Sequence, residues 1–348
     1  MTYSPMANGF MLVLVLATAK ISVALPLIPA SDSMHSTIDS NYIERYPHKL
    51  TARLFFSFQN ASLRINAGNL DKIEYRPNVN VQVGLAGYWK WFGLVLSIDN
   101  PFYKSDKAKY GNTSTLDLRF SAFGRSFAAE LFLQQYKGFY ISYPERPDDT
   151  KYIIPDMATF SVGVSAYWIY NPGRFSIRAA FIQNERQKRS AGSLLVRPSF
   201  LYYQISSANG IIPEELIIEY NIPSANHILG GNFYSIGLAP GYAYTLVFLK
   251  NVYVTAAVFP GVAAQFHTYS SELQSFSDFE FSFQLSGRFA FGYNSDKWFL
   301  GGSIQTGFNE VPAKLSNAMF NYDVAQFRIW GGTRFNFFKR KKSSTFVH

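Results

Sequence analysis

The chain has 348 residues, of which 48% are hydrophobic and only 16% are charged, and it contains no cysteine. Its longest apolar run, residues 9–19, falls short of the roughly 20 residues that a membrane-spanning helix needs, so a helical membrane protein is excluded. The lack of cysteine excludes disulfides, thiolate metal sites and thiol nucleophiles. The net charge of +9 comes from Lys and Arg dispersed along the chain, which argues against a nucleic-acid partner.

The N-terminal segment resembles a secretory leader. Residues 11–16 are apolar, and Ser22 and Ala24 place small residues where a signal peptidase reads them. We therefore expect a signal peptide over residues 1–24, followed by a periplasmic segment over residues 25–49. The alternative is a buried N-terminal helix, because no Lys or Arg precedes the apolar core of this segment.

Alternation of apolar and polar residues at every second position dominates the chain between residues 50 and 338 and predicts β-strands. Leu116 and Phe120, for example, share one face of a segment whose other face carries Asp117 and Arg119. One face of such a strand favours an apolar environment and the other favours water.

In chain order, the predicted strands are residues 50–59, 76–89, 91–99, 114–124, 126–137, 157–170, 174–184, 194–206, 231–248, 252–266, 280–293, 298–309 and 322–337. A weaker strand at residues 216–220 would make the count even. The sequence thus predicts an all-β protein, a closed antiparallel barrel of about fourteen strands. Twelve strands are the alternative, because Pro198, Pro240 and Pro260 lie inside proposed strands and would mark bulges, edges or turns.

Aromatic residues, 18% of the chain, decide between a soluble sandwich and a membrane barrel. Four tryptophans flank short connections: Trp89, Trp91, Trp168 and Trp298. Aromatic side chains gathered at one end of successive hairpins form a girdle, which is typical of a membrane interface. Short connections near residues 90, 124, 171, 250 and 295 alternate with long ones near 60–75, 100–113, 138–156, 185–193, 267–278 and 309–321. Because bacterial barrels turn tightly in the periplasm and loop widely outside, we expect a transmembrane barrel over residues 50–338 in the outer membrane, surrounded by lipid.

The alternation also predicts which charged side chains line the lumen, and arginine outnumbers carboxylate among them. A surplus of fixed positive charge would favour anions in an open pore. The alternative is a hydrogen-bonded polar network inside a plugged barrel. The predicted lumen-lining residues are Arg53, Asp117, Arg119, Glu130, Arg178, Glu185, Arg197, Arg288, Arg328 and Arg334.

Residues 183–192 are dense in long polar side chains. We interpret this run as a solvated outward loop, with a segment that folds into the lumen or binds a ligand as the alternative. The basic stretch Lys339-Arg340-Lys341-Lys342 marks a C-terminal tail, residues 339–348, that we expect in water or against lipid phosphates.

The chemistry of catalysis is poorly represented. The five histidines are His35, His48, His227, His267 and His348, and none has the spacing of a metal pair or of a recognisable triad. We therefore predict no enzyme, no metal and no cofactor. If the barrel did act on lipids, His227 and His267 near the outer rim would be the residues to test.

Several strings resemble an uncharacterised outer-membrane family of the Bacteroidota, domain of unknown function 4421. The resemblance spans nearly the whole mature chain, but the tail after Phe338 departs from the aromatic end of many barrels. It implies an outer-membrane barrel and carries no activity. The strings are Tyr42-Ile43-Glu44-Arg45-Tyr46-Pro47, Tyr75-Arg76-Pro77-Asn78, Tyr136-Lys137-Gly138-Phe139-Tyr140, Arg178-Ala179-Ala180-Phe181, Gln183-Asn184-Glu185-Arg186-Gln187, Ser190-Ala191-Gly192-Ser193 and Pro240-Gly241-Tyr242-Ala243-Tyr244.

These observations favour a pore or transporter for small solutes. A plugged barrel that anchors envelope proteins is the second hypothesis, and a lipid-acting enzyme is the third. The sequence does not indicate a substrate or an oligomeric state.

Overall fold

The computed structural model describes residues 38–67, 70–79, 81–100, 102, 106–222, 228–271, 275–315 and 318–336. All of these belong to one compact unit that begins at Ile38. The expected signal peptide, residues 1–24, and the basic tail, residues 339–348, lie outside the described residues. No helix in the described part of the chain is long and apolar enough to span a membrane.

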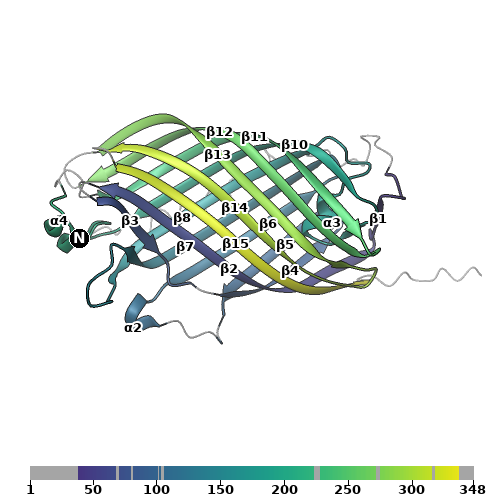
Figure 1. Ribbon diagram of the computed structural model, residues 1–348, viewed down its shortest axis with the longest axis horizontal. Helices are drawn as coiled ribbons and strands as arrows, with labels where there is room; N and C mark the ends of the chain where they lie inside the picture. The colour runs from purple at the N-terminus through teal and green to yellow at the C-terminus, as the bar shows by residue number, and fades with distance from the viewer. Residues whose placement is uncertain are drawn as a thin grey trace, which may run out of the picture. The chain divides into compact units, whose positions relative to one another are not determined.

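Within these ranges, twelve antiparallel strands form a closed barrel, in which β15 pairs with β2 to complete the ring (Figure 1). The predicted closed antiparallel barrel is therefore confirmed. Its strands are β2 (Lys49–Ala67), β4 (Gln82–Trp89), β5 (Phe92–Asp99), β6 (Ser114–Phe123), β7 (Phe127–Tyr143), β8 (Tyr152–Ile169), β10 (Ala191–Ser206), β11 (Ile228–Phe248), β12 (Val252–Ser271), β13 (Ser275–Asn294), β14 (Trp298–Leu315) and β15 (Ala318–Asn336).

The strand count follows the alternative of twelve, because two predicted strands are not strands. Residues 174–184 contain the helix α3 (Ile177–Phe181), which begins where the Ser176 hydroxyl accepts a hydrogen bond from the backbone N–H of Ala179. This is a helix N-cap, which competes locally with extended structure. Residues 216–220 fall largely in the helix α4 (Glu214–Glu219), whose Leu216 is fully buried.

The three prolines lie inside strands without making turns. Pro198 lies in β10 where its ladder with β8 is interrupted between Val196 and Ser199. Pro240 lies in β11 where the ladder with β12 is interrupted between Leu238 and Tyr242. The missing N–H donors therefore coincide with breaks in the ladder, where a strand tolerates proline.

The barrel wall is longer than its apolar belt. Outward residues of β13 change from Phe279, Phe281 and Phe283 to Ser277, yet the ladder between β12 and β13 continues to Ser275. Several connections predicted to be long loops are therefore partly strand. The short strand β3 (Leu70–Arg76), which we did not predict, joins the end of β2 to the end of β7 beyond the shorter strands β4, β5 and β6.

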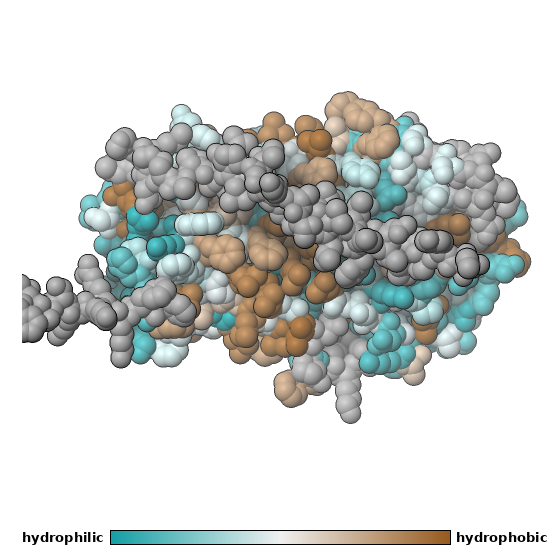
Figure 2. All heavy atoms as spheres, turned by 180° about the vertical axis from the view of Figure 1, so that it is seen from behind, coloured by the Kyte–Doolittle hydropathy of each residue, from teal (hydrophilic) through white to brown (hydrophobic). Residues whose placement is uncertain are grey.

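Alternation separates the inner from the outer face as predicted. Phe283 is 54% exposed on the outside, whereas its neighbour Ser282 is 6% exposed and hydrogen-bonds Gln265 inside. Hydrophobic residues gather in the middle of the face shown in Figure 2, with hydrophilic residues toward both ends. An apolar belt of this extent, with Trp168 and Trp298 exposed beside the turns, is typical of an outer-membrane-type barrel.

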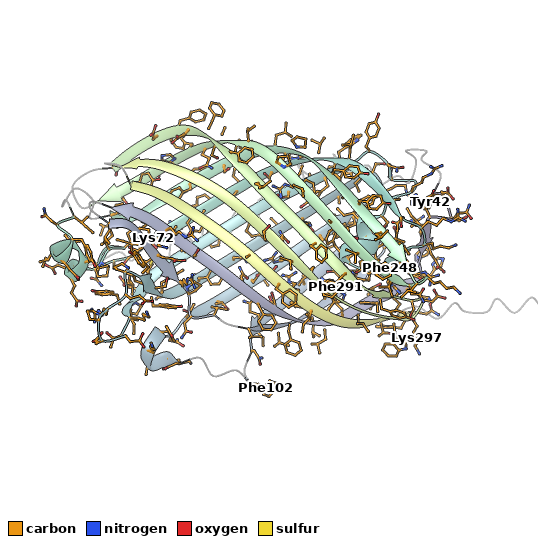
Figure 3. All side chains as sticks on the ribbon, in the orientation of Figure 1. Tyr42, Lys72, Phe102, Phe248, Phe291 and Lys297 are labelled. Carbon is orange, nitrogen blue, oxygen red and sulfur yellow. The ribbon has the colours of Figure 1, made fainter. Side chains whose placement is uncertain are left out.

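The short turns and both ends of the barrel chain share one end of the molecule. Lys49 opposite Asn336, the turn at Lys90 and the turn at Lys297 all lie there, and Figure 3 places Lys297 and Tyr42 at this end and Lys72 at the other. In bacterial outer-membrane barrels, short turns of this kind face the periplasm.

The connection between β8 and β10 departs from prediction. We expected a tight turn near residue 171 and an outward loop at 185–193, but residues 170–190 form one long connection at the short-turn end. It contains α3 and the strand β9 (Glu185–Gln187), which pairs with β1 (Ile43–Arg45) in a separate two-stranded sheet.

Candidate functional site

Residues 171–190, hereafter the plug, fill the short-turn mouth of the barrel. Phe175, Ile177 and Ile182 are buried and pack in one hydrophobic cluster with inward side chains of the wall such as Phe299 and Trp330. Burying these apolar groups explains why the segment folds inward, since each buried side chain of this kind contributes about 1.5–3 kcal/mol.

Wall residues bind the backbone of the plug. Arg53 of β2 donates from Nη1 to the carbonyl oxygen of Phe181 (3.0 Å) and to Oε1 of Gln183 (3.2 Å). Arg334 of β15 donates to the carbonyl oxygen of Gln183 through Nε (2.7 Å). Hydrogen bonds of this kind satisfy plug carbonyls that have no partner in a sheet, and charged donors make them stronger than neutral ones.

The acidic side chain of the plug is also held. Glu185 accepts a hydrogen bond from the Ser176 hydroxyl (2.6 Å) and forms ion pairs with Arg178 (3.3 Å) and Arg45 (3.5 Å). The carbonyl oxygen of Glu185 accepts from Nδ2 of Asn294 on the wall (3.1 Å). Glu185 and Arg178 thus stabilise the plug from within and do not lie on the barrel wall.

Tyr46, between β1 and β2, lies at the same mouth, with the Arg334 guanidinium 4.3 Å from the centre of its ring. Burial raises the pKa of its hydroxyl above the ordinary tyrosine value, although Arg334 opposes the shift. The hydroxyl therefore stays protonated and donates to Oδ1 of Asp296 (3.3 Å) in the β13–β14 turn.

A chamber of about 130 Å³ lies in the barrel next to the plug. Phe181 and Ile182 of the plug form its floor. Its charged lining among the described residues consists of five arginines and one carboxylate: Arg53, Arg119, Arg197, Arg288, Arg328 and Glu130. These six residues come from six different strands, and Arg53 and Arg328 are 275 residues apart in the sequence. Closure of the barrel brings them together.

The carboxylates at the chamber are already paired. The Glu130 carboxylate accepts hydrogen bonds from both terminal nitrogens of Arg288 (3.2 and 2.5 Å) and from the hydroxyl of Tyr167 (3.1 Å). Asp117, beside the chamber, accepts from Nε of Arg119 (3.0 Å) and from Gln134 (2.9 Å). Five arginines against two carboxylates leave a surplus of three positive charges.

Arg53, Arg197 and Arg328 carry that surplus, and of these Arg53 is bound to the plug. Nε and Nη2 of Arg328 are buried without a hydrogen-bond partner among the described residues, and its guanidinium lies 5.1 Å from the centre of the Phe55 ring. Arg197 lies over Phe259 at 5.2 Å, and its Nε also lacks a partner in the described part of the chain. Aromatic faces offset part of the cost of burying a cation, but donors left unmatched favour a bound anion or water.

The opposite half of the barrel is filled by a second hydrophobic cluster, which includes Ile73 and Tyr75 of β3 and Leu216 of α4. His267, expected near the outer rim, lies inside β12 with 0% exposure between Phe233 and Tyr269, because the strand continues past its predicted end. His227 lies outside the described residues. Within those residues no group of acidic or histidine side chains is placed to hold a metal ion.

A family model described as domain of unknown function (DUF4421) matches residues 37–334. The chain belongs to this family. No curated protein matches it.

Solved outer-membrane structures resemble the DUF4421 barrel only distantly. The protease OmpT of Escherichia coli has 7% identity and a TM-score of 0.36, with 84% of this chain and 97% of that chain covered. The translocator domain of the autotransporter NalP from Neisseria meningitidis has 12% identity and a TM-score of 0.35, with 86% and 90% covered. The toluene transporter TodX of Pseudomonas putida has 9% identity and a TM-score of 0.27, with 85% and 92% covered. Scores this low carry no argument about activity.

The ten residues predicted for the lumen of the DUF4421 barrel divide into two groups. Six line the chamber and Asp117 adjoins it, as described above, whereas Arg178, Glu185 and Arg334 lie in or against the plug. For residues 183–192 we preferred a solvated outward loop, and the structure instead follows the alternative, a segment folded into the barrel. The signal that could have revealed it is the run of polar residues at 183–187, four of which are buried.

Proposed function

We propose that this protein is an outer-membrane barrel that conducts small anionic solutes through its arginine-lined chamber, with the plug as its periplasmic gate. The observation that carries the proposal is the surplus of arginine around one chamber, with donors of Arg328 unmatched among the described residues. Rings of fixed positive charge select anions at close quarters. The apolar belt and exposed interfacial tryptophans support the location in the outer membrane.

The size of the chamber favours small solutes. A volume of about 130 Å³ corresponds to roughly four water molecules at about 30 Å³ each. A phosphate or a small carboxylate is of that order, and a sugar or peptide is not. Conduction then requires two parts to move: the plug, whose hydrogen bonds to Arg53 and Arg334 close the floor, and the hydrophobic cluster that fills the opposite half of the barrel.

Planar-bilayer recording of the refolded barrel tests this proposal. We expect gated current whose reversal potential in a chloride gradient shows anion preference. The double variant Arg197→Gln/Arg328→Gln should lose that preference, whereas Lys137→Gln, which removes an exposed cation from the outside of β7, should keep it. A barrel that inserts correctly but passes no current, even when the plug is loosened by Arg334→Ala, would refute a conduit.

A scaffold for envelope proteins is the second candidate function, and the plug favours it. The plug and the β1–β9 sheet form an ordered periplasmic surface, where Arg186 pairs with Glu44 and Asp296. Cross-linking in cells followed by affinity purification separates the two functions, because a scaffold retains a stoichiometric envelope partner through this surface and conducts nothing. Replacing Lys188, which is exposed on the plug, should then weaken the binding of the partner and leave the barrel intact.

A further inference from the structure

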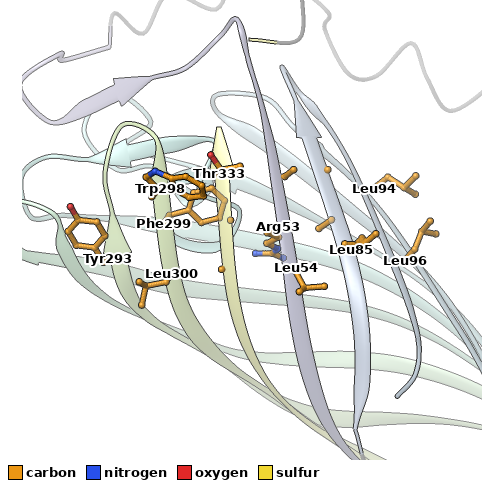
Figure 4. A pocket seen from close by; sticks show the side chains of 15 residues that line it. Arg53, Leu54, Leu85, Leu94, Leu96, Tyr293, Trp298, Phe299, Leu300 and Thr333 are labelled. Carbon is orange, nitrogen blue, oxygen red and sulfur yellow. The ribbon is translucent and has the colours of Figure 1, made fainter. Parts of the chain in front are cut away.

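A large groove lies on the outside of the barrel, over the seam where β15 closes against β2 (Figure 4). Its volume is about 840 Å³, within the range of about 300–1,000 Å³ typical of ligand sites. Leu85, Leu94 and Leu96 form one side, and Trp298, Leu300 and Tyr293 form the other. The groove is therefore apolar and opens outward, on the side of the wall that lipid would cover.

Small residues in register make its floor. Thr333 of β15, Ala52 of β2 and Gly87 of β4 occupy neighbouring positions across three strands. Gly331 lies two residues along β15, next to Leu54. A Cβ atom added at Gly87 or at Gly331 would meet nothing within 4 Å. Close packing does not require glycine at either position. The two glycines therefore leave a hollow in a belt whose exposed side chains are mostly large and apolar or aromatic.

Two exposed lysines flank the periplasmic end of this hollow. Lys90 follows Gly87 by three residues in the β4–β5 turn, and its ammonium lies 4.6 Å from the centre of the Trp89 ring. Lys297 precedes the groove residue Trp298 and lies 5.3 Å from its ring. Interfacial tryptophan and lysine mark the level of lipid headgroups, where cations attract phosphate.

We propose that the groove binds a phospholipid of the inner leaflet, with an acyl chain along the Gly87–Gly331 floor and the phosphate against Lys90 and Lys297. The inference rests on the membrane location in the proposed function and is independent of conduction. Charge complementarity favours a lipid over a second copy of the chain. A symmetric dimer through this face would bring the lysines of both copies to the same level of the membrane, where like charges repel.

Native mass spectrometry of the detergent-purified barrel, titrated with dioleoylphosphatidylglycerol, tests the groove. Gly87→Leu/Gly331→Leu fills the floor without a clash, and Ala256→Leu, exposed on the outside of β12 away from the groove, is the matched control. We expect wild type and control to retain one tightly bound lipid and the double glycine variant to bind it at least tenfold more weakly. Lys90→Gln and Lys297→Gln should each weaken binding roughly fivefold, the effect of one interfacial lysine.

Equal lipid retention in the glycine variant and in Ala256→Leu overturns the proposal. So does a wild-type dimer that becomes monomeric in the glycine variant, because the occupant would then be a second copy. Heat-modifiable migration confirms that each variant is folded before it is measured. Insertion and conductance are recorded separately, so a barrel that inserts but ignores the groove substitutions refutes this inference without touching the proposed function.

Discussion

Glu130 is the one carboxylate that lines the chamber among the described residues, and replacing it with Gln tests whether the surplus charge there is real. The substitution keeps the shape of the side chain, so it opens no cavity. It removes the negative charge of the carboxylate, whose oxygens accept hydrogen bonds from both terminal nitrogens of Arg288 at 3.2 and 2.5 Å. The hydrogen bond from Tyr167 weakens as well, because its acceptor is no longer ionised.

The expected cost is about 3 kcal/mol of unfolding free energy. Leaving one member of a buried ion pair alone costs about 3–5 kcal/mol, and the 27% exposure of the Glu130 side chain places this case at the low end. The five arginines would then face only Asp117, which Arg119 and Gln134 already engage. Glu130→Gln should therefore destabilise the barrel more than an isosteric change at a neutral residue.

Urea unfolding in lipid vesicles, followed by tryptophan fluorescence with and without phosphate, measures this effect. An anion that occupies the chamber stabilises the folded state by about 2.7 kcal/mol at 100 times its Kd. We expect phosphate to restore most of the lost stability in Glu130→Gln and to stabilise the wild type less. A variant as stable as wild type, or an identical effect of phosphate on both proteins, would refute the account of the chamber.

Three further predictions follow from the wall and the plug. Phe283→Arg should hinder membrane assembly at a cost of about 2–4 kcal/mol, whereas Ser277→Arg, on the same face of β13 beyond the apolar belt, should assemble in vesicles like wild type. Arg334→Ala should release the Gln183 carbonyl and increase the proteolysis of residues 171–190 by added protease, without unfolding the wall; unchanged protection would count against the anchoring role. Gly138 has φ of +91° and a Cβ there would lie 2.1 Å from the Asn112 carbonyl oxygen, so Gly138→Ala should cost about 1–3 kcal/mol in urea unfolding, and a neutral result would contradict this geometry.

The wall could be predicted from sequence because each strand carries its own signal. Leu116 and Phe120 face outward and Asp117 faces inward, as alternation requires, and no knowledge of the neighbouring strands was needed to assign them. Strand ends were predicted less well. Beyond the belt, outward residues such as Ser277 are polar, so the alternation fades while the backbone ladder continues.

The plug could not be predicted in this way, because its direction depends on partners far away in the sequence. Residues 174–181 begin with the same alternation as a strand, and only the cap at Ser176 indicates a helix. Gln183 is buried because Arg53 and Arg334 approach it, and these lie 130 and 151 residues away. A local pattern identifies polar side chains that need partners, but it does not reveal which wall supplies them.

Arg53 links the chamber to the plug and gives the proposed gate a physical basis. Its Nη1 binds the Phe181 carbonyl and Gln183, its Nη2 donates to Tyr88 (2.8 Å), and the same side chain lines the chamber. An anion that enters the chamber competes for this guanidinium, so occupancy weakens the attachment of the plug. By linkage, loosening the plug must then change anion affinity by the same factor. A plug whose protection from protease is identical with and without phosphate would separate the two and leave the chamber as a binding site without a gate.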